Sequence, residues 1–387
     1  MIQEKISVLV CDDSALMRNL ISKMIEADPE LTVAGTAMNG RFALDKLQTL
    51  NPDVIVLDLE MPEMNGIEFL KERKARGLKI PVVILSSMAQ KGARITMEAL
   101  ALDAEDFILK PSSGSSDIGN VQEQLNNLVK AYGRKYKQSG ASAVPAGKKP
   151  ARTSPAAPAA SRESAPAAET GTAARKAAAP AGASAPRPAR KPLTRQVEVV
   201  ALGISTGGPN ALREVFPKLD PGLPVPVLVV QHMPAGFTKE FAASLDRICP
   251  LEVKEAEDGD LLKPGRVLIA PGDSHIEVEQ RKLATVIRLS QAPLRSGHRP
   301  SADFLFESVG KTFGGRALAV IMTGMGKDGA TEIGRIYQEG GLTVAQDQES
   351  CVVFGMPRVA IENGFIDHVV PLEQMADIIN RLVNDNN

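Results

Sequence analysis

The sequence predicts an α/β fold made of two doubly wound domains joined by a disordered linker. Three observations support this prediction. Short, continuous apolar runs alternate with amphipathic helical patterns in residues 1–138, and the same alternation resumes at residue 195. Residues 139–194 between them hold 20 Ala and 9 Pro and almost no large apolar side chain. Unbroken apolar strands belong to parallel sheets covered by helices on both faces, whereas a segment without large apolar residues has no core to bury.

The composition excludes several broad classes of protein. The 387 residues carry 45 Lys and Arg against 46 Asp and Glu, so the net charge of −1 provides no cationic field for nucleic acid or anionic membrane. No apolar run approaches the roughly 18 residues that span a bilayer, which argues against direct membrane insertion. Three widely spaced cysteines and the lack of a secretory signal are typical of a reducing cytoplasm. We therefore expect a cytoplasmic protein that binds no nucleic acid.

Charge divides the chain at the same places as hydrophobicity. Residues 1–138 have a net charge of −2, residues 139–194 of +7, and residues 195–387 of −6. We expect these three ranges to be a first domain, a flexible linker and a second domain. The basic linker is interpreted as a spacer, although its charge would also allow contact with the acidic domains or an acidic partner.

The first domain has five expected strands, each followed by a helical pattern. The strands are predicted at 5–11, 31–37, 53–58, 81–86 and 105–109. Helical periodicity follows through Leu16 to Ile25 and at 40–50, 66–76, 93–102 and 118–136. Five strands in about 130 residues fit one small parallel sheet covered on both faces.

Polar residues follow four of these strands, where a doubly wound fold gathers its functional groups. Asp12 and Asp13 follow the first strand, Asp58 the third, Ser86 the fourth and Lys110 the fifth. Clustered carboxylates repel one another and suit a hard cation such as Mg²⁺. One carboxylate could then attack phosphorus and form an aspartyl phosphate, whose oxygens Ser86 and Lys110 could hold.

This segment resembles the receiver domain of two-component response regulators. The matching pieces are Cys11-Asp12-Asp13-Ser14, Asp58 with Met61-Pro62 and Asn65-Gly66, Ser86, and Lys110-Pro111. The resemblance implies that Asp58 accepts phosphate from a histidine kinase. It also implies an Mg²⁺ site made by Asp12, Asp13, Asp58 and the backbone carbonyl of Glu60. Ser86, Phe107 and Lys110 would be the switch residues.

The second domain places a serine, a histidine and an aspartate after three expected strands. Ser205 follows the strand at 197–204 and precedes a helical pattern that starts near Asn210. His232 follows the strand at 226–230, and Asp328 lies after the strand at 316–322. The carboxyl ends of parallel strands share one edge, so the three side chains can converge there. A serine becomes a nucleophile when an imidazole removes its proton, and a carboxylate fixes the tautomer of that imidazole.

The order of these residues separates the site from better-known serine hydrolases. Gly203 to Gly207 satisfies the G-x-S-x-G pattern, but the α/β-hydrolase order is Ser, acid, His, and here it is Ser, His, Asp. The glycines from Gly203 to Gly208 lack G-x-G-x-x-G, so a dinucleotide site is not expected.

The second domain resembles the chemotaxis protein-glutamate methylesterase/glutaminase, the CheB family. The matching stretches are Gly203 to Gly208, Gln231-His232-Met233-Pro234, Ala270-Pro271-Gly272, Gly297 to Asp303, and Thr323 to Gly329. The resemblance implies Ser205 as nucleophile, His232 as general base and Asp328 as orienting acid. Backbone N–H groups of Thr206 and Met325 would be oxyanion-hole candidates. His298 would lie near the site, outside the triad.

The resemblance also implies the reaction and its partners. The enzyme would hydrolyse glutamate γ-methyl esters on methyl-accepting chemoreceptors, releasing methanol, and would deamidate certain receptor glutamines in chemotaxis adaptation. Hydrolysis would need no cofactor, and Mg²⁺ would serve only the receiver. We hypothesise that the unphosphorylated receiver covers the active-site edge and that phosphorylation of Asp58 opens it.

Three alternatives stay open from the sequence. A DNA-binding output domain is disfavoured because residues 195–387 are acidic and lack a helix-turn-helix pattern. A phospho-regulated serine hydrolase of a non-chemotaxis sensory pathway, or one acting on a small ester or peptide, would carry the same triad. A scaffold with a decayed triad is disfavoured because Ser205, His232 and Asp328 are all present.

Overall fold

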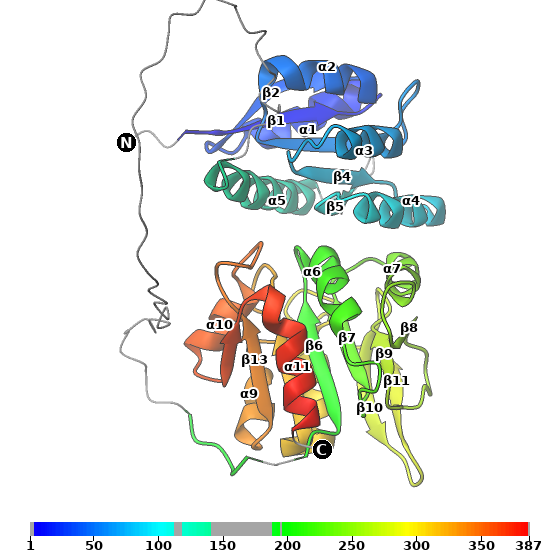
Figure 1. Cartoon of the computed structure of the whole chain (residues 1–387), viewed down its shortest axis with the longest axis vertical. Helices are drawn as coiled ribbons and strands as arrows, with labels where there is room; N and C mark the ends of the chain where they lie inside the picture. Colours follow the sequence, from blue (N-terminus) through cyan, green and yellow to red (C-terminus); the bar gives the residue numbers. More distant parts are fainter. Residues whose placement is uncertain (1–3, 112–117, 141–187, 194–195, 386–387) are drawn as a thin grey trace, which may run out of the picture.

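The computed structural model describes residues 4–111, 118–140, 188–193 and 196–385. It confirms the predicted α/β class, with two parallel-sheet units that stack end to end (Figure 1). Most of the predicted disordered linker lies outside the described residues. The described end of that segment, 188–193, lies against the second domain. There the Arg190 guanidinium pairs with Asp367 at 2.5 Å and lies 4.3 Å from the ring centre of Tyr337.

The first domain has the five-stranded parallel sheet expected of it, in the order β2-β1-β3-β4-β5. Its elements are β1 (Ile6–Cys11), α1 (Ala15–Glu26), β2 (Leu31–Ala37), α2 (Gly40–Leu50), β3 (Val54–Asp58), α3 (Gly66–Ala75), β4 (Val82–Ser86), α4 (Gln90–Ala101), β5 (Asp106–Leu109) and α5 (Ile118–Gln138). Helix α4 begins three residues before the predicted start. No side chain caps it at Ala89, and Gly92 lies in its first turn, so the usual start signal is missing.

The second domain is built on a seven-stranded sheet in the order β14-β13-β12-β6-β7-β9-β8, with all neighbours parallel. Its strands are β6 (Val199–Ile204), β7 (Val227–Gln231), β8 (Glu252–Glu255), β9 (Arg266–Ile269), β12 (Ala317–Ile321), β13 (Leu342–Gln346) and β14 (His368–Val370). Strands β10 (His275–Gln280) and β11 (Thr285–Ser290) form a separate antiparallel pair. The helices are α6 (Gly208–Val215), α7 (Phe237–Asp246), α8 (Ala302–Phe313), α9 (Ile333–Gln338), α10 (Met356–Glu362) and α11 (Met375–Asn384), with short 3-10 turns η1 (Phe216–Lys218), η2 (Gly314–Arg316) and η3 (Leu372–Gln374).

The strand order decides where the functional residues meet. Strands β12, β6 and β7 are consecutive in the sheet and are buried along their whole length. Their apolar side chains pack into two cores, one on each face of the sheet. Because the three strands are parallel and neighbouring, the residues that follow them emerge at one edge.

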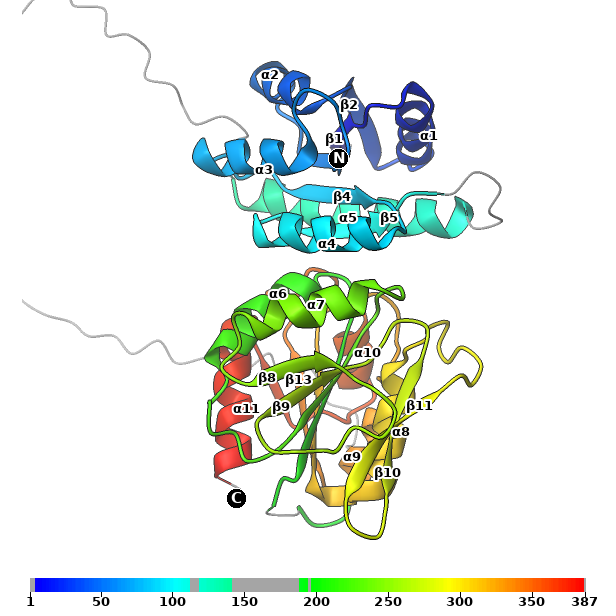
Figure 2. The same cartoon turned by 90° about the vertical axis from the view of Figure 1, so that its right-hand side faces the viewer.

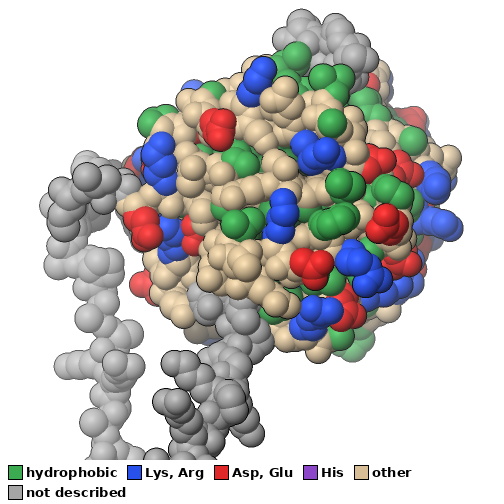
Figure 3. Space-filling model, turned by 90° about the horizontal axis from the view of Figure 1, so that it is seen from above, with side chains coloured by type: hydrophobic (Ala, Val, Ile, Leu, Met, Phe, Trp, Pro, Cys, Tyr) green, Lys and Arg blue, Asp and Glu red, His purple; other side chains and the backbone are tan. Residues whose placement is uncertain are grey.

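That edge faces the first domain. Figures 1 and 2 show α4, β5 and α5 of the first domain lying over α6 and α7 of the second. The opposite face of the first domain carries acidic and basic side chains interspersed with apolar ones (Figure 3). Among the described residues, no helix combines the length and apolar character needed to cross a bilayer.

Candidate active site

Ser205, His232 and Asp328 lie in hydrogen-bond contact at the carboxyl edge of the second sheet. Ser205 Oγ is 3.0 Å from His232 Nδ1, and His232 Nε2 is 2.8 Å from Asp328 Oδ2. The ionised carboxylate can only accept, so His232 carries its proton on Nε2 and presents a lone pair on Nδ1 to the serine hydroxyl. This is the tautomer that proton removal from a nucleophilic serine requires.

The turn between β6 and α6 brings Ser205 to the edge. Gly207 has φ +77°, a left-handed conformation that favours glycine, and helix α6 begins immediately after it. The N–H groups of Thr206 and Met325 make no hydrogen bond with any of the described residues. Two free donors beside a serine at a helix N-terminus can stabilise an oxyanion.

Asp328 is held by the start of α8. Its Oδ1 accepts from Ser301 Oγ at 2.6 Å and Asp303 N at 3.1 Å, and its Oδ2 accepts from Ala302 N at 2.6 Å. Burial alone would raise the pKa of Asp328, but hydrogen bonds from His232, Ser301 and the Ala302 N–H outweigh it and lower that pKa to about 2. The carboxylate is therefore ionised at neutral pH and fixed from several directions.

A second histidine covers the face of the first. The rings of His298 and His232 are stacked with centroids 3.8 Å apart and an interplanar angle of 8°. His298 Nδ1 donates to the Ser296 carbonyl at 2.9 Å. Burial and the nearby His232 lower the pKa of His298 to about 4, so its imidazole is neutral at neutral pH.

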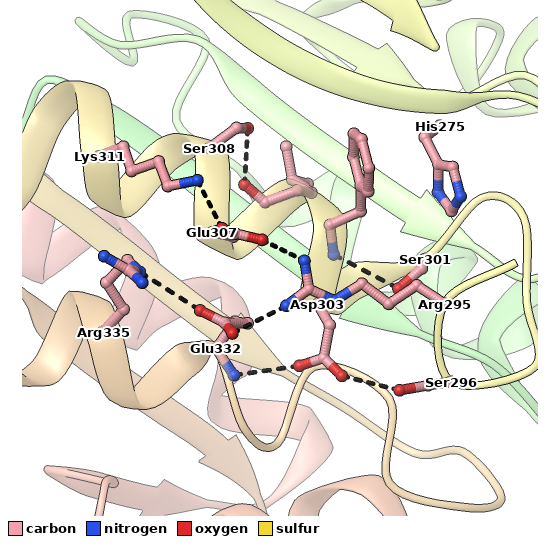
Figure 4. A network of polar contacts seen from close by, with 12 residues as sticks. His275, Arg295, Ser296, Ser301, Asp303, Glu307, Ser308, Lys311, Glu332 and Arg335 are labelled. Atoms are coloured by element: carbon pink, nitrogen blue, oxygen red, sulfur yellow. Dashed lines mark hydrogen bonds and ion pairs between the residues drawn. The ribbon is translucent and has the colours of Figure 1, made fainter. Parts of the chain in front are cut away.

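A network of charged side chains anchors the loop that carries His298 (Figure 4). Arg295 pairs with Glu307 on α8 and, at 2.8 Å, with Glu332. The Ser296 hydroxyl donates to Asp303 at 2.9 Å, and the Glu332 N–H donates to the other oxygen of that carboxylate at 3.0 Å. This loop is thereby tied to the same helix that holds Asp328.

The triad opens into a cavity of about 550 Å³ that both domains line. The second domain contributes the triad serine and histidine together with Gln231, Met233, Pro234, His298, Arg299 and Met325. The first domain contributes residues of β5 and α5, among them Phe107, Leu109, Gln124 and Leu128. The first domain thus forms one wall of the cavity above Ser205.

Specific contacts join the two domains beside Ser205. The Asp106 carboxylate on β5 accepts from the Gly207 N–H at 2.8 Å. The Asn210 side chain donates to the carbonyls of Ala104 and Glu105 at 2.9 and 3.1 Å. Burial raises the pKa of Asp106 to about 6, although its hydrogen bonds oppose that rise.

One predicted switch residue, Phe107, contacts the second domain, and another, Ser86, contacts a receiver helix that faces that domain. Phe107 stacks on Phe237 of α7, with ring centroids 5.0 Å apart. Ser86 Oγ lies 2.7 Å from Thr96 Oγ1 on α4, and α4 faces the second domain.

The acidic cluster of the first domain is assembled as the sequence predicts. Ligand oxygens of Asp12, Asp13 and Asp58 all lie within 4.8 Å of one another. The Lys110 ammonium is 2.9 Å from Asp12 and 2.6 Å from Asp58. Burial raises the pKa of Asp58 although Lys110 opposes it. Glu60 lies two residues after Asp58 in the sequence, and its N–H donates to Asp58 Oδ1 at 3.3 Å.

Sequence reasoning missed the residues whose roles depend on distant contacts. Ser301 supports Asp328, and Asp106 and Asn210 join the two domains. The one available signal was Asp106 itself, a carboxylate in an otherwise apolar strand, Asp106-Phe107-Ile108-Leu109. Asp328 does not cap the helix that follows it, because α9 starts only at Ile333.

Comparison with known proteins agrees with this arrangement. Residues 200–379 match the family model described as CheB methylesterase, and residues 8–118 match the response regulator receiver domain. The chain is 54% identical over 383 residues to the protein-glutamate methylesterase/protein-glutamine glutaminase of Treponema denticola, which covers 98% of both chains. The chain belongs to the CheB methylesterase family.

Two further relatives match the whole chain or its second domain. The protein of the same name from Treponema pallidum is 50% identical over 389 residues, covering 97% of this chain and 96% of that one. The crystal structure of the Thermotoga maritima CheB methylesterase catalytic domain is 41% identical, with a TM-score of 0.48, and covers 49% of this chain and 100% of that domain. The two Treponema relatives match the receiver and methylesterase parts of this CheB protein together.

Proposed function

We propose that this CheB protein is a phosphorylation-regulated protein-glutamate methylesterase and protein-glutamine glutaminase that acts on chemoreceptors. The observation that carries the proposal is the continuous chain from Ser205 Oγ through His232 to Asp328, at 3.0 and 2.8 Å, opening into a cavity. The names of the relatives favour this activity over a hydrolase of another sensory pathway. The proposed substrate is the cytoplasmic part of a methyl-accepting receptor, and the proposed location of the enzyme is therefore the cytoplasm.

In the proposed reaction, Ser205 attacks the side-chain carbonyl carbon of a glutamyl methyl ester. His232 Nδ1 takes the serine proton as the new C–O bond forms, and the resulting imidazolium donates through Nε2 to Asp328. The same proton then passes to the departing methoxide, which leaves as methanol. Water, deprotonated by His232, hydrolyses the glutamyl-serine ester and regenerates the hydroxyl.

The tetrahedral intermediate carries its negative charge on the former carbonyl oxygen. The N–H groups of Thr206 and Met325 are the proposed donors to this oxygen, and neither has another partner among the described residues. Esters and primary amides give the same kind of oxyanion, so one site can serve both activities. With an amide, the leaving group that receives the proton is ammonia.

The receiver is the proposed regulatory input, with Asp58 as the acceptor of a phosphoryl group from a histidine kinase. The three carboxylates fit an Mg²⁺ ion. The buried Oδ2 atoms of Asp12 and Asp58 face the Lys110 ammonium and no other donor among the described residues, so they are available as oxygen ligands. Asp12, Asp13, Asp58 and the Glu60 carbonyl would hold the ion, which would neutralise charge between the acceptor and the phosphoryl oxygens. Lys110 would hold a phosphoryl oxygen in place of the Asp58 carboxylate.

We propose that closure by the receiver lowers the activity of the enzyme before phosphorylation. A receptor helix needs access to Ser205, and β5 and α5 form a wall of the cavity above it. Phosphorylation would draw Ser86 away from Thr96 and move Phe107 off Phe237, which separates the domains.

Replacing the acceptor tests this regulation. We expect Asp58→Asn to abolish stimulation by a small-molecule phosphodonor while the basal rate of methanol release is retained. The triad lies in the other domain, so the chemistry itself is untouched. Methanol release from methylated receptors, with and without the phosphodonor, measures both quantities. Stimulation equal to that of the wild type would rule out Asp58 as the acceptor.

The Asp106 contact makes closure dependent on pH. Because burial raises the pKa of Asp106 to about 6 in the closed form, that form binds a proton more tightly than an open form in which Asp106 meets water. Closure is therefore favoured as pH falls through 6 and weakened above it. Between pH 7 and 5 we expect the ratio of basal to stimulated activity to fall roughly tenfold.

The matched variant for this prediction is Asp106→Asn, which keeps the shape of the side chain but cannot ionise. Its activity ratio should lack the pH dependence that Asp106 confers on the wild type. The side-chain carboxylate of the neighbouring Glu105, whose pKa burial raises to about 7, accepts from Arg73 and the Val82 N–H of the receiver and is present in both proteins. Parallel pH profiles for the two proteins would contradict the prediction.

A further inference from the structure

Gln231 ends β7 immediately before His232, and the proposed chemistry gives its side chain no role. The residue is only 2% exposed. Its Nε2 lies 3.0 Å from the carbonyl oxygen of Ser205 and 3.3 Å from that of His232. One amide nitrogen carries two N–H donors. Gln231 therefore connects the backbone of the nucleophile to the backbone of the base.

The Gln231 amide connects the two backbones at the point where the hydrogen bonds between β6 and β7 end. Ile204 and Gln231 are the last paired residues of β6 and β7, and the His232 N–H donates to the Ile204 carbonyl at 3.3 Å. Beyond this point β6 enters the Ser205 turn, β7 enters the loop after His232, and the ladder stops. The separation of the two backbones is then maintained by a side chain.

The same contact orients a proposed oxyanion donor. The Ser205 carbonyl accepts from Gly208 N at 2.8 Å as well as from Gln231 Nε2 at 3.0 Å. In a planar trans peptide the N–H of the next residue points opposite to that carbonyl. Holding the Ser205 carbonyl therefore fixes the direction of the Thr206 N–H, and rotation of this peptide would turn the donor away from the oxyanion.

The oxygen atom of the Gln231 amide lowers the stability of the folded domain. Gln231 Oε1 is buried with no hydrogen-bond partner among the described residues, which is costly for a polar atom. A Cβ at position 208 would lie 1.9 Å from this oxygen, so the glycine at position 208 leaves room for the Gln231 side chain. An apolar side chain would avoid the unpaired acceptor, so a stability role alone does not explain an amide here.

We propose that Gln231 is a positioning residue whose amide holds the Ser205–Thr206 peptide and the His232 backbone in the arrangement needed for proton transfer and oxyanion stabilisation. This rests on the proposed function, because it concerns the same triad. The Thr206 donor acts on charge that develops only in the transition state. Loss of the amide therefore lowers kcat and leaves KM nearly unchanged.

The test uses the full-length protein with a phosphodonor and measures methanol release from methylated receptors. Gln231→Met keeps nearly the same length but has no N–H donor. We expect its kcat to fall about 10- to 100-fold, with KM within about threefold of wild type. The matched control is Thr343→Val, which removes a buried hydroxyl that donates to the Phe365 carbonyl at 2.7 Å in the same sheet. This control should keep the wild-type kcat.

A second variant separates positioning from a general loss of packing. In Gln231→Glu, the protonated carboxyl offers one O–H donor to the two carbonyls, and the ionised form offers none. Burial between two carbonyl oxygens favours the protonated form. We expect this variant to be more active than Gln231→Met at low pH and to lose activity as pH rises, a basic limb that the wild type and Gln231→Met lack.

The outcomes distinguish this proposal from the proposed function. If the wild type releases no methanol, the esterase assignment is wrong and the role of Gln231 falls with it. If the wild type is active and Gln231→Met has a kcat within twofold of it, only the positioning role is wrong. Should Gln231→Met fail to fold, a Gln231→Glu profile without the basic limb overturns the proposal, and one with that limb supports it.

Discussion

Ser205→Ala is expected to lose at least roughly 10⁴-fold in kcat for methanol release, to a level close to background. Without this hydroxyl, the proposed glutamyl-serine ester cannot form. His232 Nδ1, which lies 3.0 Å from the serine oxygen, then has no proton to remove. Methanol release from methylated receptors in the presence of a phosphodonor measures this loss against the fully stimulated wild type.

The control for this variant is another serine of the same domain. Ser244→Ala removes a buried hydroxyl on α7 that donates to the Phe241 carbonyl at 2.8 Å and not to a triad residue. It should retain wild-type kcat. Phosphorylation of Asp58 should be equally efficient in both variants, because the acceptor lies in the receiver. Substantial turnover by Ser205→Ala would remove the proposed nucleophile.

The strands that precede the functional residues, such as β1, β3, β6, β7 and β12, were predictable because each is a largely apolar run that stops at polar residues. β1 ends at Cys11, directly before Asp12, and β6 ends at Ile204, directly before Ser205. Parallel strands buried on both faces leave this pattern, and the rule that function lies beyond their carboxyl ends indicated which polar residues would meet. The convergence of Ser205, His232 and Asp328 follows from these two facts.

The supports of the triad were not predictable, because they depend on which elements pack together. Nothing near Asp328 in the sequence indicates that the start of α8 binds its carboxylate, since Ser301 lies 27 positions away. The stacking of His298 on His232 likewise depends on how the loop before α8 returns to the sheet. Gln231 stood in a recognised motif, but its amide gained a role only through its distances to two carbonyls.

The interface between the domains was expected only in outline. The architecture of a receiver joined to a hydrolase led us to expect that the receiver covers the active-site edge. The individual contacts between the domains depend on the placement of side chains. Asp106 reaches Gly207, and Phe107 next to it reaches Phe237. The buried Asp106 carboxylate in contact with the second domain is the basis of the predicted pH dependence of closure, which no pattern in the sequence indicates.

Asp328→Asn is expected to lower kcat roughly 10³- to 10⁴-fold with little change in KM. An asparagine side chain that turns its N–H₂ toward His232 forces the proton onto Nδ1, and the lone pair that should receive the Ser205 proton is lost. If it turns its oxygen toward His232, the N–H₂ meets the donors of Ser301 and Asp303 instead. Either orientation also leaves the developing imidazolium without its counter-charge.

The measurement is kcat for methanol release, compared with thermal unfolding of the same proteins. Removing the charge from the start of α8 should destabilise the domain by about 0.3–2 kcal/mol, too little to unfold it at assay temperature. Asp367→Asn is the matched control, since this half-buried carboxylate accepts from Thr343 N at 3.2 Å and lies outside the triad. A kcat for Asp328→Asn as high as that of Asp367→Asn would show that His232 does not need this carboxylate, and the proposed triad would reduce to a dyad of Ser205 and His232.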